Sequence, residues 1–181
     1  MNWPNLITFA RLLLAIPFLV MLEGHGWEMV ALGIFVVASL TDWLDGYLAR
    51  KLNQVSELGK LMDPLVDKIL VTGALVALTA RGIIPAWSVT AILFREFLVT
   101  GLRAVEAARG VIIPAGWLGK VKAALQMIAI IALLWSLDPS GRALRDDFVA
   151  ALAIVGYWTA VGLTIASGLQ YCWAGRELLK G

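Results

Sequence analysis

The sequence has little thiol, imidazole or ionic chemistry. It contains one cysteine and one histidine, and charged residues make up 15% of its 181 residues, against about 25% in an average soluble domain. A single cysteine cannot form a disulfide within the chain, which excludes a disulfide-stapled scaffold. The net charge of +2 is too small for a nucleic-acid-binding surface. The low content of charge also argues against a water-soluble globule.

Apolar side chains are abundant instead, at 60% of the chain. Glycine, proline and short polar stretches divide them into six segments, each near the roughly 20 residues that span a bilayer. The length fits one domain. We therefore predict an all-α integral membrane protein, a single domain over residues 1–181 with six transmembrane helices. The predicted spans are 6–22, 27–48, 58–80, 84–107, 118–137 and 148–174.

Basic residues are distributed unequally between the two sides of these spans. Cytoplasmic connections of membrane proteins carry an excess of Lys and Arg. The connections after odd-numbered spans hold only Arg81, Arg142 and Arg145. The other side holds Arg50, Lys51, Lys60, Arg103, Arg109, Lys120, Lys122, Arg176 and Lys180. The bias predicts a multi-pass protein of the cell (inner) membrane with both termini in the cytoplasm.

Four carboxylates interrupt the second and third spans near their cytoplasmic ends: Asp42, Asp45, Asp63 and Asp67. Ionised carboxylates are costly at membrane depth and need partners. The spacings i, i+3 and i, i+4 put each pair on one helix face. The reversal over residues 49–58 joins antiparallel helices, so the two acidic faces are expected to meet.

Two divalent cations would balance these four negative charges. Oxygen-only ligation favours Mg²⁺ or Mn²⁺, with Ca²⁺ in a looser cage, and the lack of nearby histidine or cysteine argues against zinc. The structural alternative is a charge cluster at the headgroup level, paired with lysines. Three small residues nearby, Gly46, Ala49 and Gly59, either permit close helix packing or leave a hollow for a ligand.

Written out, this segment reads Asp42-x2-Asp45-Gly46-x2-Ala49-Arg50-x8-Gly59-x3-Asp63-x3-Asp67. It resembles the signature of the CDP-alcohol phosphatidyltransferases, with every fixed position present. Residues 4–11, Pro-Asn-Leu-Ile-Thr-Phe-Ala-Arg, are also similar to that family. The resemblance implies a homodimeric membrane enzyme that faces the cytoplasm and uses a CDP-linked lipid as donor.

The resemblance also implies roles for individual residues. Asp42, Asp45 and Asp63 would hold one cation, and Asp42, Asp63 and Asp67 the second. The CDP-lipid would be bound by Gly46, Ala49 and Gly59 at the nucleotide, Arg50 as electrostatic support, and Asn5 and Thr8 near the phosphates. An acceptor hydroxyl would attack in line while CMP departs, and Asp67 is our choice of catalytic base for its proton.

Four cations further along the chain suggest the acceptor. Arg95 lies near the middle of the fourth span, and Arg103, Lys120 and Lys122 follow toward the cytoplasm. Together they indicate a receptor for an anionic group, most simply a phosphate on the acceptor. The alternative for Arg95 is an ion pair with Glu96 or a dimer contact. Adjacent residues do not face each other on a helix, which argues against the pair.

The run from Arg95 to Arg103, followed by Gly119-Lys120-Val121-Lys122 and Gln126, resembles a bacterial branch of the same family, the phosphatidylglycerophosphate synthases. This favours transfer of a phosphatidyl group from CDP-diacylglycerol to glycerol 3-phosphate. Many of those proteins have threonine where this chain has Ala123, so a hydroxyl contact is missing there.

Other functions remain open. A sibling enzyme would use serine, inositol phosphate or a second lipid as acceptor. An intramembrane prenyltransferase would carry its acidic motifs on distant helices. A cation transporter would place its acids at the bilayer midplane on repeated, broken helices, whereas these acids lie near one face and the sequence shows no internal repeat.

Overall fold

A computed structural model describes residues 3–24, 26–52, 57–108, 117–137 and 147–175 of the chain. These residues form six helices and contain no strand. The helices coincide with the six predicted apolar segments to within a few residues at each end, which confirms an all-helical fold. They are α1 (Trp3–Glu23), α2 (Glu28–Leu52), α3 (Glu57–Ala80), α4 (Ala86–Ala108), α5 (Trp117–Trp135) and α6 (Asp147–Gly175).

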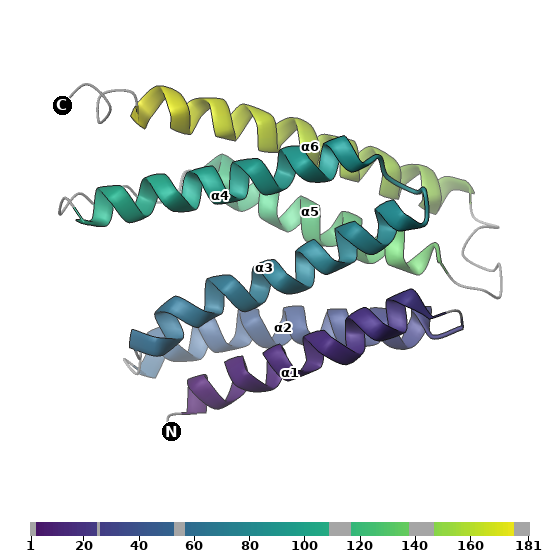
Figure 1. The fold of residues 1–181 in the computed structure, drawn as a ribbon, viewed down its shortest axis with the longest axis horizontal. Helices are drawn as coiled ribbons and strands as arrows, with labels where there is room; N and C mark the ends of the chain where they lie inside the picture. The colour runs from purple at the N-terminus through teal and green to yellow at the C-terminus, as the bar shows by residue number, and fades with distance from the viewer. Residues whose placement is uncertain (1–2, 25, 53–56, 109–116, 138–146, 176–181) are drawn as a thin grey trace.

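The helices run alternately up and down the bundle, so α1 begins and α6 ends at the same end of the molecule (Figure 1). One group consists of α1 packed against α2 and α3, and the other of α6 packed against α4 and α5. Contacts of α5 with α2 and α3, and of α4 with α3, join the two groups. Both groups supply the core, which includes Phe18, Phe35, Leu75, Ile130 and Tyr157.

The turn between α3 and α4 shows how local sequence ends a helix. Gly82 has φ of +72°, a left-handed conformation that glycine adopts without steric cost. Its N–H donates to the Thr79 carbonyl at 2.9 Å, and the Ile83 N–H donates to the Leu78 carbonyl at 3.0 Å. This is the Schellman pattern of a helix C-terminus. Pro85 then precedes the first residue of α4.

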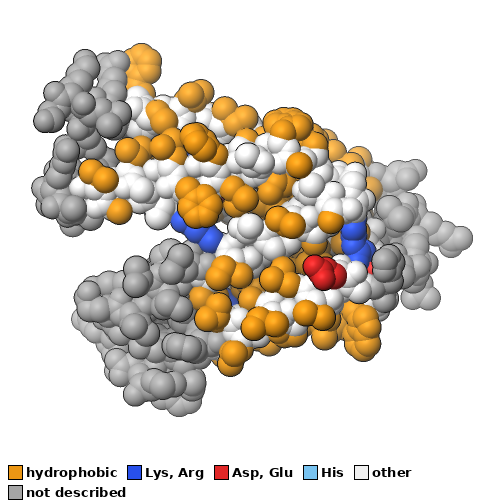
Figure 2. Space-filling model, in the orientation of Figure 1, with side chains coloured by type: hydrophobic (Ala, Val, Ile, Leu, Met, Phe, Trp, Pro, Cys, Tyr) orange, Lys and Arg blue, Asp and Glu red, His pale blue; other side chains and the backbone are white. Residues whose placement is uncertain are grey.

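Large apolar side chains cover the outside of the bundle (Figure 2). Trp117, Phe148, Phe94 and Leu169 are each at least two-thirds exposed, and monomeric soluble proteins rarely expose such continuous apolar surface. Within the described part of the chain, one helix, Phe148–Trp173, is long and apolar enough by composition to cross a membrane, with a mean hydropathy of 1.9.

Candidate functional site

The acidic positions of α2 continue a buried line of that helix. By helical register, Asp42 and Asp45 share a face with Ala31, Phe35 and Ala38, each of which is at most 1% exposed. The backbone of Asp42 and Asp45 is helical. Their side chains lie outside the described part of the structure.

The acidic positions of α3 also continue a buried line of their helix. Asp63 and Asp67 share a helical face with Leu70 and Ala74, which are 4% and 0% exposed. Because α2 packs against α3 and the two run antiparallel (Figure 1), all four acidic positions occur on the helix portions at the end where the termini lie. The side chains of Asp63 and Asp67 are likewise not described.

The predicted nucleotide-binding positions belong to the same end of the bundle. Asn5 and Thr8 fall near the start of α1, Gly46, Ala49 and Arg50 near the end of α2, and Gly59 near the start of α3. Their side chains and surroundings are outside the described part of the structure. The described side chains contain no group of three or more His, Cys, Asp or Glu residues that could hold a metal. The side chains of the four predicted aspartates are outside this described set.

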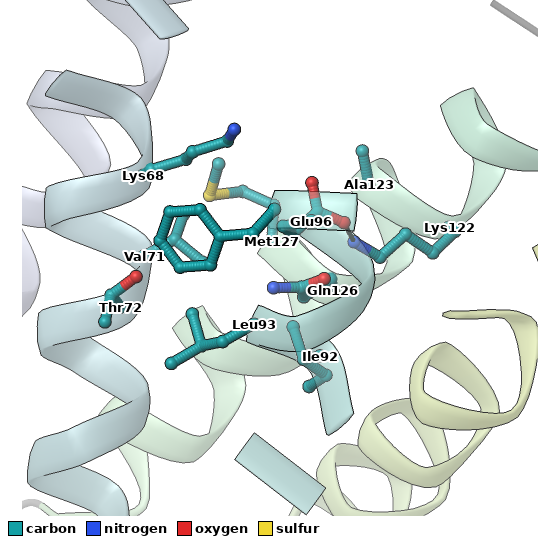
Figure 3. Close-up of a pocket in the computed structure, with 11 residues that line it drawn as sticks. Lys68, Val71, Thr72, Ile92, Leu93, Glu96, Lys122, Ala123, Gln126 and Met127 are labelled. Atoms are coloured by element: carbon teal, nitrogen blue, oxygen red, sulfur yellow. Dashed lines mark hydrogen bonds and ion pairs between the residues drawn. The ribbon is translucent and has the colours of Figure 1, made fainter. Parts of the chain in front are cut away.

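A cavity of about 90 Å³ lies between α3, α4 and α5. This is several times the 10–15 Å³ or so that one water requires. Lys68 is the first residue of α3 that lines the cavity, and it immediately follows Asp67 in the sequence. Apolar side chains form much of the wall (Figure 3). Its polar lining side chains are Lys68, Thr72, Glu96, Lys122 and Gln126.

Glu96 joins two of the predicted cations. Its Oε1 lies 2.8 Å from Arg95 Nη1 and 2.5 Å from Lys122 Nζ. The pairing of Arg95 with Glu96, which helix geometry argued against, is therefore present, because the long arginine side chain can reach its neighbour's carboxylate. Arg95 is 8% exposed, and its Nε donates to Ser167 Oγ at 3.2 Å. The result is a partly buried ionic cluster that links α4, α5 and α6.

The other two predicted cations lie elsewhere. Arg103 is exposed, and its Nη2 donates to the Tyr171 hydroxyl at 2.6 Å. The guanidinium carbons of Arg95 and Arg103 lie 5.8 Å and 5.2 Å from the centre of the Tyr171 ring. Lys120 is exposed. Of the four, Lys122 lines the cavity, Arg95 reaches it through Glu96, and Arg103 and Lys120 do not line it.

Lys68 also lines the cavity, although it was not among the four cations predicted for the acceptor site. Its Nζ donates to Thr100 Oγ1 at 2.6 Å and lies 5.7 Å from the centre of the Phe97 ring. Figure 2 shows Lys and Arg side chains in the hollow between the two groups of helices. The sequence signal that could have identified Lys68 is its position directly after Asp67, because a lysine there places a positive charge close to any ligand that the acidic residues bind.

A second, larger groove of about 550 Å³ adjoins this cavity between α1, α3 and α4. Lys68, Thr72 and Phe97 line both. The remaining wall is largely apolar, with Leu19, Ile69 and Val76 among its members. A cavity that contains charged side chains and a largely apolar groove therefore meet at Lys68, an arrangement suited to a ligand with an ionic head and a hydrocarbon tail.

Comparison with known proteins decides the family. A family model described as CDP-alcohol phosphatidyltransferase matches residues 1–166. The chain belongs to the CDP-alcohol phosphatidyltransferase family. The family predicted from the aspartate signature is therefore confirmed. The family is one of membrane enzymes, in agreement with the apolar surface of the bundle.

Several curated relatives of this CDP-alcohol phosphatidyltransferase share the name CDP-diacylglycerol–glycerol-3-phosphate 3-phosphatidyltransferase. The protein from Bacillus subtilis (strain 168) is 41% identical, over 99% of this chain and 97% of its own length. The protein from Rickettsia bellii (strain RML369-C) is 37% identical, over 94% of this chain and 93% of its own length. The protein from Salmonella choleraesuis (strain SC-B67) is 36% identical, over 97% of this chain and 95% of its own length.

Proposed function

We propose that this chain transfers the phosphatidyl group of CDP-diacylglycerol to glycerol 3-phosphate, giving phosphatidylglycerophosphate and CMP. The observation that carries the proposal is the cationic cavity beside the acidic segment of α3. Lys68 and Lys122 line the cavity, and Arg95 joins it through Glu96, the one carboxylate among its described lining side chains. Basic side chains therefore outnumber carboxylates among the described residues here, which suits a phosphate, and the curated relatives are named for an acceptor that carries one.

The donor end of the site would be held by the acidic positions. The family generally uses divalent metals, and hard carboxylate oxygens are the donors that Mg²⁺ and Mn²⁺ prefer. Bound cations would withdraw charge from the phosphorus under attack and stabilise the departing CMP. In the proposed ligand set, Asp42, Asp45 and Asp63 hold one ion, and Asp42, Asp63 and Asp67 hold the other.

The chain's own side chains would divide the remaining work. Lys122 and Lys68 hold the acceptor phosphate by charge-assisted hydrogen bonds, and this fixes the position of the acceptor's free hydroxyl. As the new oxygen–phosphorus bond forms and the bond to CMP breaks, Asp67 accepts the hydroxyl proton. Residues Asn5, Thr8, Gly46, Ala49, Arg50 and Gly59 would bind the CDP-lipid, as in the family signature.

The proposal includes an arrangement in the membrane. Six spans would place the site at the cytoplasmic face of the inner membrane, with both termini in the cytoplasm. Supporting this are the shared end of α1 and α6 in Figure 1, the basic residues near that end, and the exposed apolar side chains around the bundle. The protein would work as a homodimer, as the family resemblance implies.

Acceptor-dependent release of CMP tests the proposed function directly. Purified protein would be given CDP-diacylglycerol, Mg²⁺ and, in separate reactions, glycerol 3-phosphate, serine, inositol phosphate or a second phospholipid. We expect CMP release with glycerol 3-phosphate well above that with the other acceptors. Equal release with serine or inositol phosphate would show that the acceptor is wrong, and absence of release with every acceptor would contradict the enzymatic function.

Replacing Lys122 with methionine is expected to raise the KM for glycerol 3-phosphate about tenfold or more, because one charge-assisted hydrogen bond to the phosphate is lost. The KM for CDP-diacylglycerol should change little. Steady-state kinetics with each substrate varied in turn measures both. A raised KM for the CDP-lipid with an unchanged KM for glycerol 3-phosphate would remove Lys122 from the acceptor site.

Replacing Gly168 of α6 with alanine is expected to disturb the side chain of Arg95, which packs against this glycine. A Cβ at this position would lie 3.0 Å from Arg95 Cγ, so the arginine side chain must give way by a few tenths of an ångström, which strains its contact with Glu96. We expect the KM for glycerol 3-phosphate to rise about two- to tenfold. Gly162→Ala on the same helix is the matched control, since its Cβ would meet nothing within 4 Å. Identical kinetics for the two variants would contradict a role for Arg95.

A further inference from the structure

Gln126 is a buried polar side chain whose hydrogen bonding is incomplete. The residue is 5% exposed, and its Oε1 is buried without a hydrogen-bond partner among the described residues. Native proteins satisfy the large majority of their buried polar side-chain atoms, since an unsatisfied one destabilises the fold. A partner that is not part of the described chain is therefore expected at this amide.

The position of Gln126 links it to the cavity of the acceptor. It follows Lys122 by four residues on α5, so both side chains project from one helix face, and both line the cavity. In Figure 3 the amide lies between the ion pair of Glu96 with Lys122 on one side and the apolar side chains of Ile92 and Leu93 on the other. A ligand held at Lys122 would extend past this amide.

The charged side chains that line the cavity near Gln126 have partners of their own, and the hydroxyl of Thr72 lies across the cavity on α3. Glu96 is bound by Arg95 and Lys122, and Lys68 donates to Thr100. Ala123, one turn before Gln126 on the cavity wall, offers no hydroxyl. A carboxamide carries both a donor and an acceptor, and rotation of the amide exchanges them. Gln126 is therefore suited to a neutral ligand group that also donates and accepts, which is the character of a hydroxyl.

We propose that Gln126 binds the secondary, non-reacting hydroxyl of the acceptor and thereby selects a phosphate ester that carries two hydroxyls. This assignment rests on the proposed function, in which the phosphate binds at Lys122 and the primary hydroxyl attacks. The secondary hydroxyl lies between them in glycerol 3-phosphate and has no other assigned partner. Its hydrogen bond to Gln126 would fix the rotation of the acceptor about the anchored phosphate and so aim the primary hydroxyl.

The test compares two acceptors in wild-type protein and in Gln126→Leu. The second acceptor is 3-hydroxypropyl phosphate, which keeps the phosphate and the primary hydroxyl but lacks the secondary one. We expect wild-type kcat/KM to be about tenfold or more higher with glycerol 3-phosphate. In Gln126→Leu, kcat/KM for glycerol 3-phosphate should fall to the level of 3-hydroxypropyl phosphate, whose own value should change less than about threefold.

Two further variants control for folding and for the substitution itself. Gln126→Met keeps the length of the side chain without its amide and should show the same loss of selectivity as Gln126→Leu, with an unfolding midpoint measured in detergent for each. Gln170→Leu makes the same chemical change at an exposed position of α6 and should keep the wild-type preference.

Different outcomes separate this assignment from the proposed function. If wild-type protein uses glycerol 3-phosphate but does not prefer it to 3-hydroxypropyl phosphate, or if the Gln126 variants lose activity equally with both, the amide serves a structural water and the assignment is wrong. If wild-type protein releases no CMP with glycerol 3-phosphate and does so with another acceptor, the proposed function fails, and the assignment of the secondary hydroxyl fails with it.

Discussion

Replacement of Asp67 with asparagine is expected to lower kcat for CMP release about 10²- to 10⁴-fold, the usual contribution of a positioned general base. Asparagine keeps the size of the side chain but cannot accept the hydroxyl proton. It also removes one negative charge from the proposed ligand set of the second cation. The measurement is the rate of CMP release at saturating CDP-diacylglycerol, glycerol 3-phosphate and Mg²⁺.

A matched control and a metal titration sharpen this result. Asp147→Asn makes the same change at the first residue of α6, at the opposite end of the bundle (Figure 1), and should leave kcat unchanged. If Asp67 acts as base, higher Mg²⁺ will not restore the Asn variant, whereas a residue that serves only as a ligand is rescued in part. Near-normal turnover in Asp67→Asn at ordinary Mg²⁺ would mean that Asp67 has neither role.

Replacement of Arg81 with methionine is expected to lower the free energy of unfolding by about 1–3 kcal/mol, the usual cost of losing hydrogen bonds to a charged group. Arg81 Nη1 lies 2.9 Å from Glu28 Oε1, and the Glu28 side chain is 4% exposed. Arg81 Nη2 also donates to the Leu22 carbonyl at 2.7 Å and the Gly24 carbonyl at 3.2 Å. One side chain thus ties the end of α1, the start of α2 and the turn after α3.

A double-mutant cycle with Glu28→Gln distinguishes the ion pair from the rest of the contact. Because the neutral glutamine leaves no charge buried, the double variant should be more stable than Arg81→Met alone. Unfolding of each variant in mixed detergent gives the free energies. The KM for glycerol 3-phosphate should stay near the wild-type value in all three, since this pair is at the far end of the bundle from the cavity. Wild-type stability in Arg81→Met would contradict the proposed contribution of the pair.

The helices could be predicted from sequence because their signal is local. Apolar runs interrupted by Gly82, Pro85 and similar residues define where a helix can continue, and backbone hydrogen bonds close within a few residues. The acidic signature is also local, since the i, i+3 spacing of Asp42 and Asp45 fixes a shared face in any α-helix. The family prediction followed from this spacing and was confirmed by comparison with known proteins.

The acceptor site was harder to predict because its parts lie on three helices. Arg103, Lys120 and Lys122 are all basic residues expected near the cytoplasmic side, but of the three only Lys122 lines the cavity. Glu96 is the neighbour of Arg95 in the sequence, and in the structure it joins Arg95 to Lys122. Side chains as long as arginine and lysine can turn several ways from the same backbone position, so periodicity alone does not decide which of them meet.

The order of residues by itself determined six apolar helices, a membrane setting and an aspartate pattern that belongs to one enzyme family. Tertiary structure alone decided that α3, α4 and α5 enclose a cavity, that Lys68 lines it, and that the amide of Gln126 is buried at its wall. The physical reason is one of range. A helix is specified by neighbours a turn apart, whereas a cavity depends on how whole helices pack and cross, which is set by the sum of many distant contacts.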